Sequence, residues 1–243
     1  PPPAMNGSLR SPVRPPAARS NALGQSAPMP EPAPHAPAAP TSPRADDPDA
    51  ALVSLRQRMK LTADEFAEGK INRAQFHALY ARYSEQRSII ERLLERDPET
   101  QAWRQVAALQ GQTGMLRSSL EAMPLYYLVF KGEGAVPLLI GGKRPAEPEK
   151  IAPLIRHVWT LPNRPAFGLG RMPFKHGRWL IIATGNHSAT AVVFSLEPAI
   201  AQARLVRDLH ADFERANQAL LASGSAAAER MVFPQRALSE ALY

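Results

Sequence analysis

The chain has 243 residues, a formal net charge of +7 and no cysteine, and 44% of its residues are hydrophobic. The lack of cysteine excludes disulfides, thiolate nucleophiles and every zinc site built on Cys ligands. The sequence contains no run of about 18 apolar residues and no charged-then-apolar leader, so it predicts neither a membrane span nor a signal peptide. We therefore expect a cytoplasmic protein.

The first segment, residues 1–50, has an unusual composition. It holds 14 of the 25 prolines, with much Ala and Ser and no long apolar run. Such a segment cannot bury enough apolar surface to offset the entropy that ordering would cost. The composition predicts a disordered, Pro/Ala-rich tether.

Residues 51–98 have the pattern of a helical hairpin. Thr62 to Glu65 and Asn72 to Gln75 both fit the spacing of a capping box, in which two side chains satisfy free amides at a helix start. Gly69 stands between them, where the end of a helix favours a residue with positive φ. The second helix carries an apolar stripe at spacings of three and four residues. Its members are Phe76, Leu79, Tyr80, Tyr83, Ile90, Leu93 and Leu94.

This hairpin resembles the SHOCT module, a short oligomerisation module of bacteria. The stretch EFAEGKINRAQFHALYARY (65–83) carries the resemblance, because Gly69, Ile71, Asn72 and Phe76 stand at the corresponding places. A hairpin of this length cannot bury its apolar stripe alone, so the stripe needs a partner, either the following domain or another copy of the chain. The resemblance implies oligomerisation, and the expected contact residues are Phe76, Tyr80, Tyr83, Ile90 and Leu94.

After Asp97-Pro98 the chain has the pattern of an α+β domain over 99–222, followed by a C-terminal tail over 223–243. A helical pattern first runs from Trp103 to Met123. The expected strands are 125–130, 136–140, 166–174, 179–184 and 189–194, and the expected helices among them are 151–159 and 198–222.

Two prolines predict the edges of the sheet. Pro137 lies inside the second expected strand and Pro173 near the end of the third. Because proline cannot donate to a strand ladder, it is confined to edge strands, strand ends and bulges. The second and third strands are therefore expected at the two edges, with the other three between them.

This element order resembles the roadblock/dynein light chain family over residues 101–222. The resemblance implies a five-stranded antiparallel sheet of order 2-1-5-4-3 flanked by helices. It places 124–142 as the first hairpin and 178–198 as the last. The related longin and profilin-like folds share much of this layout.

What the roadblock resemblance implies about function is non-enzymatic. Roadblock-like domains form homodimers or heterodimers and serve as platforms or regulators for small GTPases. The resemblance therefore implies a regulatory or scaffold protein that self-associates, with a small GTPase or another protein as partner and with no cofactor. It supplies no catalytic residue.

The sequence contains no strong pattern of a catalytic or metal-binding site. His187 and Ser188 follow Gly185-Asn186 between two apolar runs, which is typical of a hairpin turn in solvent. A Ser nucleophile needs an oriented His and a third group, and neighbours at a hairpin tip rarely point at each other. On a helix Asp208 and Asp212 share a face and His210 points elsewhere, so these residues predict a solvated helix face and no metal site. None of the six histidines has compact metal-ligand spacing, and no phosphate-binding loop is present.

A basic stretch over 164–178 is the remaining candidate surface. It contains Arg164, Arg171, Lys175 and Arg178 without one acidic residue, and it falls on an expected edge strand. Charges on an edge strand either prevent pairing or contact a partner of opposite charge. Two other functions stay open: a ligand-sensing or enzymatic profilin-like domain, and a weak nucleic-acid-binding module using 164–178.

Overall fold

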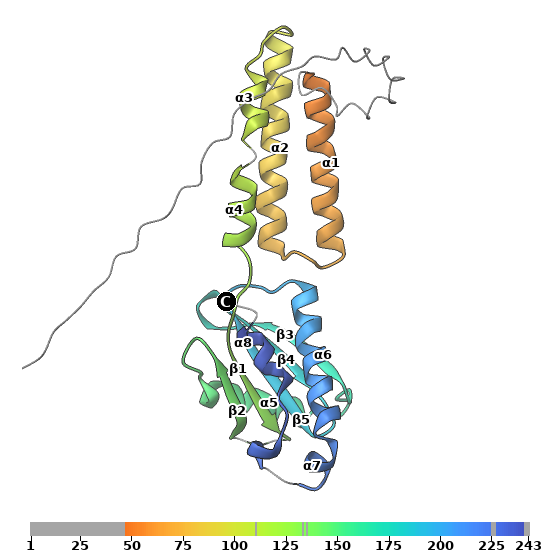
Figure 1. Cartoon of the computed structure of the whole chain (residues 1–243), viewed down its shortest axis with the longest axis vertical. Coiled ribbons are helices and arrows are strands. Elements are labelled where there is room, and N and C mark those ends of the chain that lie inside the picture. Colours follow the sequence, from red (N-terminus) through yellow and green to blue (C-terminus); the bar gives the residue numbers. More distant parts are fainter. Residues whose placement is uncertain (1–46, 110, 133, 135, 225–226, 241–243) are drawn as a thin grey trace, which may run out of the picture. The chain divides into compact units, whose positions relative to one another are not determined.

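A computed structural model describes residues 47–109, 111–132, 134, 136–224 and 227–240, all within one compact unit, Pro43–Tyr243 (Figure 1). The expected tether over 1–50 lies outside these residues except for its last four. Helix α1 (Pro48–Ala67) begins before residue 51, because Asp47 caps it by accepting from the backbone N–H of Asp49 at 3.0 Å.

Helix α2 (Arg73–Arg96) follows α1 across a tight turn. The expected capping box is present. The side chain of Asn72 accepts from the backbone N–H of Gln75 at 2.8 Å, and the side chain of Gln75 accepts from the backbone N–H of Asn72 at 2.9 Å. Gly69 has a φ of +78°, as the end of α1 requires. The first expected capping box is wrong: Thr62 lies inside α1, where its hydroxyl donates to the carbonyl of Arg58.

The helical pattern from Trp103 to Met123 divides into two short helices, α3 (Trp103–Ala108) and α4 (Gly111–Ser119). Both contact α2. Trp103 is buried in a cluster that includes Leu52, Leu55 and Ile90, and side-chain amides of α2 donate to carbonyls of this segment. These contacts join residues 103–119 to the hairpin, whereas the expected boundary at residue 98 groups them with the sheet.

The sheet has five antiparallel strands in the order β2-β1-β5-β4-β3, and this confirms the expected order and both expected edges. The strands are β1 (Pro124–Lys131), β2 (Pro137–Gly142), β3 (Gly168–Pro173), β4 (Trp179–Thr184) and β5 (Ser188–Phe194).

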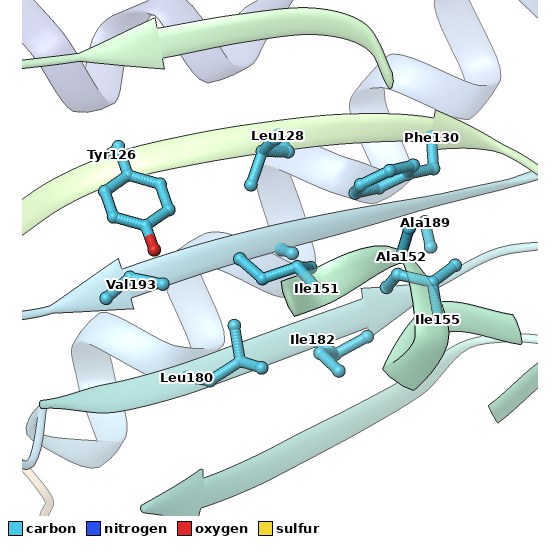
Figure 2. Close-up of a cluster of buried hydrophobic side chains, with 11 residues drawn as sticks. Tyr126, Leu128, Phe130, Ile151, Ala152, Ile155, Leu180, Ile182, Ala189 and Val193 are labelled. Atoms are coloured by element: carbon cyan, nitrogen blue, oxygen red, sulfur yellow. The ribbon is translucent and has the colours of Figure 1, made fainter. Parts of the chain in front are cut away.

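The central strand β5 is buried along its whole length because helices cover both faces of the sheet (Figure 1). Ala191 and Val193 face helix α5 (Pro148–Trp159), in the cluster drawn in Figure 2. Val192 and Phe194 point to the opposite face, against helix α6 (Ile200–Ala216). Burial on both sides explains why the sequence of this strand is continuously apolar.

The described part of residues 223–243, where a C-terminal tail is expected, folds onto the domain. After α7 (Gln218–Ala222), the described residues form two short 3₁₀ turns and helix α8 (Ala237–Glu240). Phe233 stacks on Phe213 of α6 with ring centroids 5.2 Å apart, and Leu238 joins the core under α6. Asn217 fixes this segment by exchanging hydrogen bonds with the backbone of Val232 at 2.7 and 2.8 Å. Among the residues that the structure describes, no helix has the length and apolar character needed to span a bilayer.

Candidate functional site

The β4–β5 hairpin tip is tied to α6 through one carboxylate. Glu214, itself buried, accepts hydrogen bonds from the backbone N–H groups of Asn186 and His187 at 2.8 and 2.9 Å. Its Oε1 atom also accepts from the hydroxyl of Ser188 at 2.6 Å. The expectation of a solvated tip is therefore wrong for Ser188, which is completely buried, while His187 is exposed. The Ser188 hydroxyl serves to hold this turn on α6.

A second buried polar cluster lies between β5, α6 and the C-terminal segment. Nδ1 of His210 is 2.9 Å from the hydroxyl of Thr190, which also accepts from Nε2 of Gln235 at 3.1 Å. Burial lowers the pKa of His210 to about 4, and this outweighs the opposing influence of Glu214. Asp208 and Asp212 are exposed, and His210 points away from them, as expected, but into the interior of the domain.

This cluster is closed to solvent. His210 is 1% exposed, and Thr190 and Gln235 are fully buried. The Nε2 atom of His210 and the Oε1 atom of Gln235 have no protein hydrogen-bond partner within the described residues. A general base must reach its substrate, so this histidine stabilises the interior in its neutral form and does not form an accessible site. Across the described ranges, no three His, Asp or Glu side chains are grouped so as to hold a metal ion.

Three of the four expected partner-binding residues are engaged within the chain. Arg164 donates to the carbonyl of Gly185 at 2.7 Å and lies over the ring of Trp159. Arg171 donates to the carbonyl of Pro198 at 2.8 Å, and its guanidinium is 3.5 Å from Glu197. Arg178 pairs with Glu147 at 3.5 Å, whereas Lys175 is exposed in a 3₁₀ turn. The four side chains therefore do not form one free basic surface.

The edge strand β3 pairs with β4 on one side only, and four of its six residues are exposed. The N–H of Phe174 donates to the carbonyl of Arg178, just beyond the last residue pair of the β3–β4 ladder. Hydrogen-bonded pairs alternate along an antiparallel ladder, so the N–H groups of Leu169 and Arg171 face outward. Pro173 also falls on the outward side, where its missing N–H costs the ladder nothing.

The two edges of the sheet differ in the regularity of their ladders. The β1–β2 ladder has a register shift between Val129 and Phe130, whereas the β3–β4 ladder has regular register throughout. Each edge strand also contacts a helix, β2 with α8 and β3 with α6. Two of the six β3 residues are glycines, and a regular edge strand is a template for pairing with another chain.

An apolar groove runs beside this edge, between β3 and the segment that follows α5. It encloses about 210 Å³, and its walls include Val158, Leu161, Leu169, Met172 and Ile182. Leu161 is 44% exposed and Met172 37% exposed, so the groove opens to solvent beside the unpaired backbone groups. The edge and the groove together form the candidate interaction surface, which we name the β3 surface.

The expected oligomerisation residues divide into two sets. Ile90 is fully buried, and Tyr83 and Leu94 lie against the same cluster inside the helical part. Phe76 and Tyr80 belong instead to an aromatic group on the outside of the hairpin: Phe76 stacks on Phe66 at 4.7 Å and meets Tyr80 at 5.4 Å. Phe66 and Tyr80 remain 37% and 39% exposed. Tyr80 is the most exposed of the five residues, whereas Phe76, Tyr83 and Leu94 are half-buried.

Comparison with family models, curated proteins and solved structures gives no match to this chain. The resemblance to the roadblock family therefore rests on the strand order and the helices on both sheet faces.

Proposed function

We propose that this protein is a non-enzymatic regulatory or scaffold protein of the cytoplasm that self-associates through its β3 surface. The observation that carries the proposal is the regular ladder of the β3 edge beside an apolar groove. Two copies related by a two-fold axis would pair their β3 strands antiparallel, so that Leu169 and Arg171 of each copy donate to the other. Main-chain hydrogen bonds would then set the register, and the groove would bury apolar side chains.

The side chain of Arg171 is compatible with such pairing. It is turned toward Glu197 and the carbonyl of Pro198. Because that charge is neutralised within its own chain, the two Arg171 residues of a dimer repel each other less than free arginines would. The roadblock resemblance supports a small GTPase as the class of further partner.

The mass of the full chain in solution, measured by light scattering, tests self-association. We expect a dimer for the wild type. Arg171→Pro removes an outward N–H and no ladder bond, so it should give a folded monomer with an unchanged circular dichroism spectrum. Arg171→Ala is the matched control, because it loses the same ion pair but keeps the N–H, and it should stay dimeric. A monomeric wild type, or a dimeric Arg171→Pro variant, contradicts the proposal.

The GTPase proposal has a separate test. The immobilised full chain is exposed to native extract that has been loaded either with GDP or with a non-hydrolysable GTP analogue. Capture of a small GTPase in one nucleotide state and not in the other is the expected result. Equal capture in both states, or no GTPase in either, contradicts this part of the proposal and leaves the dimer test unaffected.

A further inference from the structure

A second cavity shares no lining residue with the groove of the β3 surface. It encloses about 250 Å³ between the start of β1, the end of β5, and helices α6 and α8. Its walls include Ala122, Phe194, Leu209 and Leu238, and Leu205 of α6 contributes from an exposed position. The cavity opens to solvent, and most of its lining is apolar. Concave, mostly apolar pockets with a few polar groups are typical sites for small ligands.

The polar groups of the lining restrict the chemistry of that ligand. Both polar atoms of the Gln202 side-chain amide form hydrogen bonds within the protein. Its Oε1 accepts from the N–H of Ala199 at 3.0 Å, and its Nε2 donates to the carbonyl of Ala122 at 2.8 Å. Both backbone groups of Met123 are bonded to Ser195. These groups are satisfied internally, so they offer little to a ligand.

Glu121 is the one charged side chain of the lining. Its side chain is exposed, and the nearby Arg117 on α4 pairs with Glu65 and not with Glu121. A carboxylate or phosphate ligand would meet a like charge there and no arginine or lysine in the lining. A protonated amine would meet the opposite charge at the end of an apolar pocket.

We propose that this cavity binds a small amphiphile with an apolar body and a positively charged amine. The apolar part enters between α6 and α8, and the ammonium group stays at the mouth beside Glu121. This inference is independent of self-association, since the cavity shares no residue with the β3 surface.

Three probes with the same phenylbutyl body separate the contribution of the head group: phenylbutylamine, phenylbutanol and phenylbutyrate. Binding to the full chain is measured by isothermal titration calorimetry at low salt. We expect the amine to bind roughly fivefold more tightly than the alcohol, which is the value of an exposed ion pair near 1 kcal/mol. The carboxylate should bind more weakly than the alcohol.

Two variants and one control locate the site. Glu121→Gln should bring the affinity for the amine down to that for the alcohol without changing the affinity for the alcohol. Leu205→Trp extends a half-exposed residue into the cavity and should weaken binding of all three probes. Ala216→Trp places the same ring on the exposed end of α6, outside the lining, and should leave binding unchanged. Failure of every probe to bind, preference for the carboxylate, or undiminished binding to Leu205→Trp overturns the proposal.

Discussion

Acidification should destabilise this protein through His210, and the size of the effect follows from its burial. In the unfolded chain the pKa of a histidine is near 6.5, whereas in the folded protein burial lowers that of His210 to about 4. Between these two values the unfolded chain binds a proton that the folded protein does not. The stabilisation from neutral His210 is therefore fully present above about pH 6.5, and it is lost as the pH falls toward 4.

The difference in pKa corresponds to about 3 kcal/mol of unfolding free energy. The assay is urea unfolding of the wild type and of His210→Gln at neutral pH and at several acidic pH values. Glutamine does not titrate, and it keeps a polar atom near the hydroxyl of Thr190. The variant should start less stable at neutral pH but should lose about 3 kcal/mol less on acidification. The other side chains of the two proteins are identical, so the difference in acid dependence reports on position 210. An equally steep acid dependence in His210→Gln would refute this reasoning.

Three further predictions concern stability and assembly. Val193→Asp places an unpaired charge in the central strand and should cost several kcal/mol, measured as a fall in Tm, whereas Val193→Ala should cost less. Ser188→Ala deprives the buried Glu214 carboxylate of one donor and should lower the unfolding free energy by about 1–2 kcal/mol. His187→Ala, at an exposed neighbour, should change it by less than about 0.5 kcal/mol in the same denaturation assay; equal effects of these two variants would contradict the assigned contacts. Tyr80→Asp should reduce any assembly through the hairpin, measured as a lower mass in light scattering, without changing Tm. If the wild type assembles and the variant has the same mass, Tyr80 has no role in assembly.

The sheet could be predicted because its determinants are local in the sequence. Pro137 and Pro173 mark the two edge strands, and the continuous apolar run of β5 indicates a strand buried on both faces. The capping box of α2 is likewise contained in four residues. In each case the physical reason for the structure lies within one element.

The buried polar contacts could not be predicted in this way. Ser188 meets Glu214 across 26 residues of chain, and Thr190 meets Gln235 across 45. Neither pair has a spacing that would distinguish it from solvated side chains on a turn and a helix. The sequence pattern predicts that His210 lies on a helix, but it does not show that this side of α6 meets the sheet. Burial of a polar side chain depends on a partner that only the folded chain brings near.

The involvement of the C-terminal residues in the core has a consequence for synthesis. The cluster under α6 includes Leu238, and the neighbouring cluster includes Met231 and Phe233. These residues are synthesised after β1 and α6, so they also leave the ribosome after them. One apolar face of the nascent sheet therefore stays incompletely covered until residue 238 has emerged. This interval is when the domain is most exposed to holding chaperones and to aggregation on crowded polysomes.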